Sequence, residues 1–307
     1  MKALVVGGNG FIGSHLVDRL NVLGWEVVIL DPHERRFDEN PAGVRHIRGD
    51  ASNTYIVREA LAGVDVVFHL AWTTIHLSAN QDPVADIQSN LITSVQLIRA
   101  CLESRVARII FMSSGGTVYG TVSSFPTPET HPSEPVTAYG ITKLAVENYL
   151  HMFRQLHGLD YVILRPSVPY GPRQNPLAKQ GAVAVFLYRI GHRLPITLFG
   201  SGDYSRDFFF VGDLIQAMVL SATAELNGNR VFNIGGGVDI TLINLVRRIE
   251  DLLGQHAILE HQPARPFDPP RILLDISSAR EALGWKTGTD FPTGLSQTWE
   301  WISSRFD

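Results

Sequence analysis

Short runs of β-branched and other apolar residues recur along the first half of the chain, and stretches of helical periodicity separate them. The runs cover residues 3–6, 26–30, 65–70, 108–112 and 161–165. They are apolar without alternation, which is typical of parallel strands buried on both faces, and the segments between them have the length of crossover helices. The pattern predicts an α/β fold of the Rossmann type, built on a doubly wound parallel sheet.

The texture of the sequence changes after residue 165, where prolines and turn-forming residues become frequent. We therefore divide the chain into a first domain over residues 1–165 and a smaller C-terminal region over residues 166–307. The apolar run at 231–234 is typical of a late strand, so we expect segments near 203–235 to return to the main sheet.

Composition excludes several classes of protein. Of the 307 residues, 45% are hydrophobic and 18% are charged, which excludes a disordered or collagen-like chain. Lys and Arg number 26 against 30 Asp and Glu, so a net charge of −4 provides no basic field for nucleic acid, although a small anionic ligand stays possible. No apolar run reaches the roughly 18 residues of a membrane span. We expect a soluble, cytoplasmic protein with no membrane or nucleic-acid partner.

The single cysteine and the histidines indicate neither a reactive thiol nor a metal site. Cys101 has no partner for an internal disulfide and lies in an amphipathic stretch at residues 90–103, so we expect an inert core thiol. The histidines show no metal-ligand spacing with carboxylates, so no metal is assigned.

A glycine cluster follows the first predicted strand directly. It reads Gly7-x-x-Gly10-x-x-Gly13 and opens an amphipathic stretch at residues 14–23. Glycines at this spacing permit a tight turn and close approach of the backbone to a pyrophosphate, while a helix N-terminus supplies free N–H groups and a positive dipole. Alone the motif is also compatible with a plain glycine turn.

Asp31 favours the dinucleotide interpretation. It ends the second predicted strand 18 positions after Gly13, where a carboxylate can accept both ribose hydroxyls of NAD and would repel a 2′-phosphate. NAD is therefore favoured over NADP. Arg35 and Arg36 lie close enough to pair with such a phosphate, and their alternative role is that of solvated loop charges.

A tyrosine and a lysine share one face of a later predicted helix. Tyr139 and Lys143 stand at i and i+4 near its start, and Gly158 ends it. A nearby cation lowers the pKa of a phenol, which brings a tyrosine toward use as a base near neutral pH. A stripe of apolar residues at helical spacing predicts that this helix is anchored against another part of the fold; it comprises Ala145, Tyr149, Met152 and Leu156.

These motifs together resemble one family over nearly the whole chain. Besides the glycine cluster and Tyr139-x-x-x-Lys143, they are residues 113–120 (SSGGTVYG), residues 165–171 (RPSVPYG) and Arg206-Asp207. The sequence is similar to the extended short-chain dehydrogenase/reductases, and within them to the NAD-dependent nucleotide-sugar epimerases and dehydratases of UDP-glucose 4-epimerase type.

The resemblance implies an isomerase of carbohydrate metabolism that acts on a UDP-hexose such as UDP-glucose or UDP-galactose. Tyr139 would take the proton from the sugar C4 hydroxyl while hydride passes from C4 to the nicotinamide. The 4-keto sugar would then turn and receive hydride on its opposite face. Residues 1–165 would form the NAD-binding domain and residues 166–307 the nucleotide-sugar-binding region.

Cofactor contacts carry over from the resemblance by position. The NAD-binding residues would be Gly7, Gly10, Phe11, Ile12, Gly13, Asp31, Asp50, Ala51, Leu70, Ala71, Asn90, Tyr139 and Lys143. For Asn90 the alternative is a cap on the helix that follows it.

Two positions depart from the family pattern. Gly115 stands where the family commonly carries the Ser or Thr whose hydroxyl bridges the sugar oxygen and the catalytic tyrosine. We expect Thr117, or failing that Ser114, to supply this catalytic hydroxyl, and Thr117 to contact the substrate. Val168 replaces an Asn that ordinarily holds a diphosphate oxygen.

Other polar residues would then bind the nucleotide. The resemblance places Arg206 and Arg265 on the diphosphate, which a guanidinium fork suits. It places Asp268 on the ribose hydroxyls. Surface salt bridges are the alternative role for all three residues.

Other activities remain open to different degrees. Dehydration needs an acid and a base in the loop that here reads Gly115, Gly116 and Thr117, so it is disfavoured. An NAD(P)H-dependent reductase of nucleotide 4-keto-sugars would use the same Tyr139 and Lys143 and stays open. A non-catalytic NAD-binding sensor or scaffold is the alternative from another class. The resemblance also implies a homodimer formed through the helix of Tyr139 and the stretch at 90–103.

Overall fold

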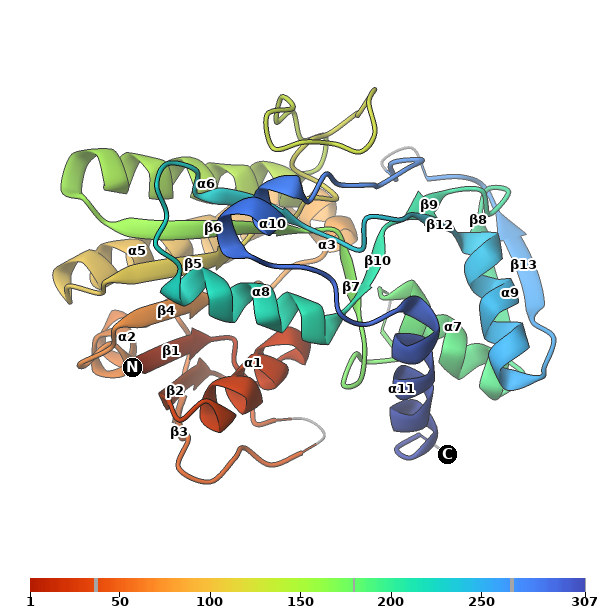
Figure 1. The fold of residues 1–307 in the computed structure, drawn as a ribbon, viewed down its shortest axis with the longest axis horizontal. Coiled ribbons are helices and arrows are strands. Elements are labelled where there is room, and N and C mark those ends of the chain that lie inside the picture. Colours follow the sequence, from red (N-terminus) through yellow and green to blue (C-terminus); the bar gives the residue numbers. More distant parts are fainter. Residues whose placement is uncertain (36–37, 179, 266–267, 307) are drawn as a thin grey trace.

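A seven-stranded parallel sheet forms the centre of the molecule, in the order β11-β6-β5-β4-β1-β2-β3 (Figure 1). The computed structural model describes residues 1–35, 38–178, 180–265 and 268–306. The strands are β1 (Lys2–Val6), β2 (Glu26–Asp31), β3 (Arg45–Arg48), β4 (Val66–His69), β5 (Arg108–Met112), β6 (Asp160–Pro166) and β11 (Val231–Ile234). Because the strand order reverses between β1 and β4, the sheet is doubly wound and ligands are expected at its carboxyl edge there. The predicted fold class is confirmed.

Helices cover both faces of this sheet (Figure 1). One layer consists of α1 (Phe11–Val22), α8 (Val211–Thr223) and α10 (Ser277–Leu283), and the other of α2 (Thr54–Ala60), α5 (Thr93–Glu103) and α6 (Ala138–His157). Within β1, Ala3 and Val5 face the first layer while Leu4 and Val6 face the second. Burial on both faces explains why the strands read as unbroken apolar runs.

A smaller group of elements lies at one end of the sheet (Figure 1). It contains β7 (Val168–Tyr170), α7 (Ala182–Gly191), β8 (Pro195–Phe199), β9 (Ser205–Arg206), β10 (Phe208–Phe210), β12 (Ile240–Thr241), α9 (Leu242–Leu253), β13 (Ile258–Gln262) and α11 (Phe291–Ser303). Its strands pair two by two, as β10 with β7, β12 with β9 and β13 with β8. A separate apolar core holds α7, α9 and α11 together. The chain returns from this group through β11, which pairs in parallel with β6.

The segment between β4 and α5 is irregular. It contains the short helices α3 (His76–Gln81) and α4 (Pro83–Asp86), followed by a π-helical segment, η1 (Ile87–Ile92), that runs directly into α5. Residue Asn90 is buried inside η1. Single π-helical turns often occur at functional sites, because they redirect side chains that an α-helix would place elsewhere.

Helix α6 turns a different face toward the core from the one predicted. Its start and end follow the sequence signals, since Thr137 caps it through the Gly140 N–H and Gly158 closes it with a φ of 71°. The stripe of Tyr149, Met152 and Leu156 is exposed, however, and Leu156 is 66% exposed.

The buried face of α6 carries polar residues, which is why hydrophobicity alone selected the wrong face. Lys143 and Glu147 lie on it together with Val146, Leu150 and Phe153. The helix is anchored, as expected, but through a mixed face, and its apolar stripe remains open on the surface.

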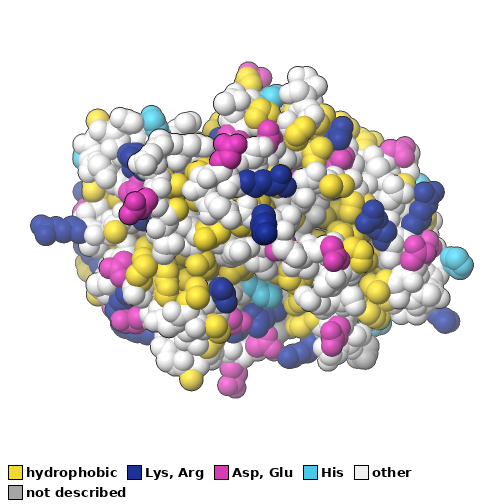
Figure 2. Space-filling model, viewed as in Figure 1, with side chains coloured by type: hydrophobic (Ala, Val, Ile, Leu, Met, Phe, Trp, Pro, Cys, Tyr) yellow, Lys and Arg dark blue, Asp and Glu magenta, His cyan; other side chains and the backbone are white. Residues whose placement is uncertain are grey.

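The surface, the helices and the lone cysteine bear on three expectations from the sequence, which concern nucleic acid, membranes and a reactive thiol. Basic and acidic side chains are interspersed over the face shown in Figure 2. Among the described helices, none is long and apolar enough to cross a membrane. Cys101 lies on the buried face of α5, and burial raises the pKa of its thiol, which keeps it unreactive.

Candidate active site

The glycine cluster forms the turn between β1 and α1. A Cβ at Gly13 would overlap the carbonyl oxygen of Gly7, and Gly7 itself has a φ of +85° and would bring a Cβ to 2.8 Å from Ala71 N. A Cβ at Gly10 would meet only Gly7 O, at 3.5 Å. The turn therefore requires glycine at positions 7 and 13, whereas at position 10 glycine keeps a face of the turn open.

The N-terminus of α1 is suited to an anion. The helix begins at Phe11, and its N-cap residue, Gly10, has no side chain to accept from the first N–H groups. These donors and the positive end of the helix dipole are what a pyrophosphate needs. Phe11, Ile12 and Gly13 are the residues that carry them, so the donor set fits a dinucleotide.

Asp31 lies at the carboxyl end of β2, close to this turn. Its side chain is buried, and its two oxygens accept from the backbone N–H groups of Asn9 (3.1 Å) and His33 (2.9 Å). Each carboxylate oxygen keeps a free lone pair for a ribose hydroxyl. The arrangement fits the adenosine ribose of NAD, and it holds the carboxylate rigidly.

The remaining predicted cofactor residues follow the neighbouring strands. Asp50 and Ala51 come after β3, and the Asp50 carboxylate accepts from Ser52 N at 2.8 Å. Leu70 and Ala71 come after β4, where their backbone N–H groups both donate to Val6 O. All four therefore lie beyond the carboxyl ends of strands adjacent to β1 or β2.

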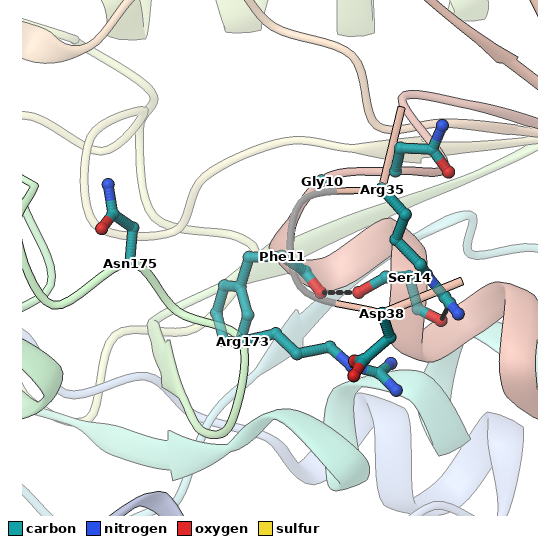
Figure 3. Close-up of a pocket in the computed structure, with 8 residues that line it drawn as sticks. Gly10, Phe11, Ser14, Arg35, Asp38, Arg173 and Asn175 are labelled. Carbon is teal, nitrogen blue, oxygen red and sulfur yellow. Dashed lines mark hydrogen bonds and ion pairs between the residues drawn. The ribbon is translucent and has the colours of Figure 1, made fainter. Parts of the chain in front are cut away.

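A cavity of about 220 Å³ opens beside the N-terminus of α1 (Figure 3). Two arginines line it. Arg173, from the loop after β7, donates to Asp18 at 2.6 Å and to Asp38 at 2.9 Å. It therefore connects the smaller group of elements to α1. Arg35 donates to Asp18 at 2.7 Å and to the carbonyl oxygen of Ser14.

Arg35 is therefore not a solvated loop charge, which was the alternative role predicted for it. Its side chain is 5% exposed, and its guanidinium is committed to α1 rather than free for a 2′-phosphate. Arg36 lies outside the described residues.

Tyr139 and Lys143 lie at the start of α6, next to the end of β5. Lys143 is buried, its Nζ donates to Met112 O at 2.7 Å, and it lies 3.5 Å from the centroid of the Trp72 ring. The Tyr139 ring centroid is 5.7 Å from this ammonium. The Tyr139 ring stacks on His76 at a centroid distance of 4.8 Å. The helical spacing thus brings phenol and ammonium together as expected.

The pKa of Tyr139 does not move in the expected direction. Burial raises the pKa of the phenol, and the charge of Asp86 raises it further. Burial also lowers the pKa of Lys143 well below its ordinary value, against the opposing charges of Glu147 and Asp86. Desolvation outweighs the neighbouring cation, so the expectation of a lowered phenol pKa was wrong.

A buried polar network supports the tyrosine from behind. Asp86 accepts from Thr142 Oγ1 at 2.5 Å, from Asn90 Nδ2 at 2.8 Å and from Thr74. The Asn90 side-chain oxygen accepts from Thr73 N at 2.9 Å. Asn90 therefore fixes the loop after β4, and the alternative that it caps a helix was wrong because it lies inside η1. Asp86 belongs to no motif in the sequence, and its only signal there is its position four residues before Asn90.

A second network ties α6 to β5 and β6. The guanidinium of Arg165 pairs with Glu147 at 2.5 Å, with both side chains less than a tenth exposed. Ser113 donates to the same carboxylate. These residues hold the buried face of α6 in register with the strand ends.

The structure explains the glycine at position 115. A Cβ there would overlap the Leu274 side chain and lie 2.9 Å from Arg165 O. No hydroxyl-bearing side chain fits this position without a shift. Thr117 is buried and lines a second cavity, while Ser114 is partly buried and its carbonyl oxygen accepts from Thr117 Oγ1 at 3.4 Å.

This second cavity, of about 120 Å³, lies between the start of α6 and the segment before α10. His76, Thr117, Asp268 and Arg271 are among the residues that line it. Of these, His76 and Arg271 were missed, since the motifs around them gave no signal. The structure brings Thr117 and Asp268, which are 151 positions apart in the sequence, to one cavity.

The two predicted diphosphate arginines lie near this region in different settings. Arg206 donates through Nη1 to Ser205 O and to Pro269 O, at 2.8 Å each, and its positive charge lowers the pKa of His76. Arg265 places its guanidinium 3.5 Å from the centroid of the Phe199 ring. Neither arginine forms a salt bridge within the described residues, so the surface salt-bridge alternative was wrong for both.

The fold and this site define a nucleotide-binding protein of the doubly wound α/β class, with a tyrosine and lysine pair at the carboxyl edge of the sheet. A family model described as the NAD dependent epimerase/dehydratase family matches residues 3–235, and the chain belongs to this family. The predicted family resemblance is confirmed.

Individual relatives match along their whole length. The UDP-glucose 4-epimerase of Mycolicibacterium smegmatis is 35% identical over 99% of both chains. The crystal structure of the Thermotoga maritima UDP-glucose 4-epimerase with UDP-glucose is 34% identical, covers 100% of both chains and superposes with a TM-score of 0.95. The Thermus thermophilus UDP-glucose 4-epimerase in complex with NAD is also 34% identical, covers 99% of both chains and has a TM-score of 0.92.

Proposed function

We propose that this protein is an NAD-dependent 4-epimerase of a UDP-hexose of the glucose and galactose type. One observation carries the proposal: Tyr139, with Lys143 one turn on, is joined through the stacked His76 ring to the cavity that Thr117 also lines. The glycine turn and Asp31 lie on the neighbouring strands, as the site of a dinucleotide would. The Mycolicibacterium smegmatis and Thermotoga maritima relatives carry this activity by name.

In this proposal the protein residues hold and move one proton. Tyr139 takes the proton from the C4 hydroxyl, and the ammonium of Lys143 stabilises the phenolate that forms. Thr117 supplies the bridging hydroxyl that the family pattern would place at position 115, with Ser114 as the second choice. NAD, held by the glycine turn and Asp31, would supply the hydride chemistry that the reaction at C4 requires.

The two parts of the chain divide the binding. Residues 1–165 hold NAD, through the glycine turn, Asp31 and the residues that follow β3 and β4. Residues 166–307 hold the UDP-sugar, with Arg206 and Arg265 on the diphosphate and Asp268 on the ribose hydroxyls. The cavity that contains Asp268 lies against the start of α6, which supports a substrate that spans both parts.

The exposed apolar stripe of α6 supports a homodimer. Ile141, Tyr149, Met152 and Leu156 are between 38% and 66% exposed along this one helix. Ile92, at the end of η1, which packs against α6, is 47% exposed. Apolar surface of this kind favours association, and light scattering should give twice the chain mass. We further propose a cytoplasmic location, which fits a chain whose one cysteine is buried and unpaired.

The function is tested by incubating the purified protein with UDP-glucose and, separately, with UDP-N-acetylglucosamine and the two galacto epimers. We expect interconversion of glucose and galactose forms without added cofactor, and NAD(H) retained by the protein. Tyr139→Phe should keep the cofactor and lose about 10²- to 10⁴-fold in turnover.

Other outcomes would replace the proposal. Oxidation of added NADPH with a nucleotide 4-keto-sugar, and no epimerisation, would make the protein a reductase. If neither the parent nor Tyr139→Phe turns over any nucleotide sugar while both still bind NAD, the protein is a sensor.

A further inference from the structure

His76 occupies a position in the site that no motif announces. It is the first residue of α3, in the irregular segment after β4, and its ring stacks on the Tyr139 ring at 4.8 Å with an angle of 23° between the planes. It also lines the cavity that contains Thr117 and Asp268. His76 therefore contacts the proposed base and the proposed sugar pocket at once.

The ring nitrogens of His76 are available to a ligand. Across the part of the chain that the structure describes, neither ring nitrogen of this half-buried side chain forms a hydrogen bond. Its nitrogens are not among the buried side-chain atoms without a partner, so a ligand in the cavity can reach them. One face of the ring is committed to Tyr139, so its nitrogens, on the ring edge, are what it can offer to a ligand.

Burial favours the neutral imidazole of His76. It lowers the pKa of this histidine; the Asp268 carboxylate acts in the opposite direction, and the Arg206 guanidinium lowers the pKa further. A neutral imidazole donates from one nitrogen and accepts at the other. This pairing suits a sugar hydroxyl, which both donates and accepts.

We propose that His76 binds the hexose of the UDP-sugar through a hydrogen bond from its ring edge to a sugar hydroxyl, while its ring face holds the Tyr139 phenol in place. The proposal rests on the proposed function, because Tyr139 then marks the sugar end of the substrate. Two separable consequences follow. The nitrogens set the affinity for the sugar, and the stacked ring sets the position of the base.

Three variants separate these roles. His76→Phe keeps a stacked ring and removes both nitrogens, His76→Gln keeps a hydrogen-bonding group and removes the ring, and His76→Ala removes both. His256→Phe makes the same exchange at a side chain that is fully exposed and serves as the matched control. For each variant, KM and kcat for UDP-glucose, the inhibition constant of UDP and the thermal midpoint are measured.

We expect His76→Phe to raise KM for UDP-glucose about 10-fold, the loss of one hydrogen bond to a buried group, with kcat nearly retained and the UDP inhibition constant unchanged. His76→Gln should have the KM of the parent and a lower kcat. His76→Ala should have a raised KM and a lowered kcat. The control should match the parent. Equal weakening of UDP and UDP-glucose, or unchanged KM in His76→Phe and His76→Ala, would overturn the proposal.

Failure of the proposed function gives a different result. If the parent interconverts no UDP-hexose, calorimetric titration of UDP-glucose and of UDP into the parent and His76→Phe still decides the point. A selective loss for UDP-glucose supports sugar binding by His76, and equal affinities in parent and variant contradict it.

Discussion

The ammonium of Lys143 lies 3.5 Å from the centroid of the Trp72 indole ring and donates to the carbonyl oxygen of Met112 at 2.7 Å. Within the described residues it has no carboxylate in salt-bridge range. The ring face and the carbonyl are therefore its main support in a buried site, where burial lowers the pKa of the lysine.

Trp72→Leu should remove much of this support. We expect a loss of about 1–2 kcal/mol in the free energy of unfolding, since cation–π contacts are worth about that much when desolvated. Turnover should fall about 10-fold because Lys143 loses its position. Urea unfolding and initial rates measure the two effects. Trp72→Phe, which keeps a ring, should lie between parent and Leu variant; identical rates in all three would show that the contact does not position the lysine.

The glycine turn predicts opposite outcomes for two alanine substitutions. Gly13→Ala places a Cβ against Gly7 O, so the turn itself must shift. We expect the cofactor-free protein to unfold at markedly lower urea concentration. Gly10→Ala meets only an ordinary contact at 3.5 Å, so its cofactor-free stability should match the parent, while its NAD affinity falls at least 10-fold because a methyl group projects on the open side of the turn. Normal NAD binding by Gly10→Ala would refute this assignment.

Asp31 should set the preference between the two nicotinamide cofactors. Asp31→Asn keeps an oxygen that can accept from a backbone N–H group, so the fold should be retained, but it removes the charge. Hydrogen bonds to charged groups are worth about 1.5–3 kcal/mol, so NAD affinity should drop about 10-fold or more. NADP affinity should rise, because repulsion of the 2′-phosphate is relieved. Fluorescence titration with both cofactors gives the ratio, and an unchanged ratio would remove Asp31 from this role.

The sheet and the local motifs were predictable because each depends on neighbouring residues. Strand β5 has the predicted bounds, since an unbroken apolar run is what burial on both faces demands. Edge strand β3 buries only Ile47, so its bounds carried no such signal. The turn at Gly7 to Gly13 and the pair Tyr139 and Lys143 each lie within one local segment, and their placement followed from spacing alone.

The rest of the site depends on contacts that join distant segments. His76 reaches Tyr139 across the irregular turns after β4, and Arg271 comes from the far end of the chain. Position 115 reads as a missing hydroxyl in the sequence, whereas the structure fills that space with Leu274. Buried polar residues such as Glu147 also misled the amphipathic pattern of α6, because an ion pair in the core looks like a surface charge in sequence.

Asp207 should make stability depend on pH. Its carboxyl is fully buried, and burial raises its pKa to about 7, against the Gly236 N–H donor at 2.6 Å and a weaker contact to Leu274 N. The ordinary value is 3.8, so between these two pH values the folded protein holds a proton that the unfolded chain has lost. The free energy of unfolding should therefore fall as pH rises from about 4 to about 7 and level off above that range, by up to about 4 kcal/mol for this group.

Asp207→Asn tests this dependence, because an amide has nearly the same shape and stays neutral at every pH. Urea unfolding of parent and variant at intervals between pH 4 and pH 8 gives two curves, whose difference isolates the contribution of this carboxyl from all other titrating groups. Near pH 4, where the parent carboxyl is protonated, the free energy of unfolding of the variant should be equal to or lower than that of the parent. As pH rises, the free energy of unfolding of the variant should increase relative to that of the parent. Parallel curves over the whole range would mean that the carboxyl is already ionised in the folded protein, with its charge held by the Gly236 and Leu274 donors.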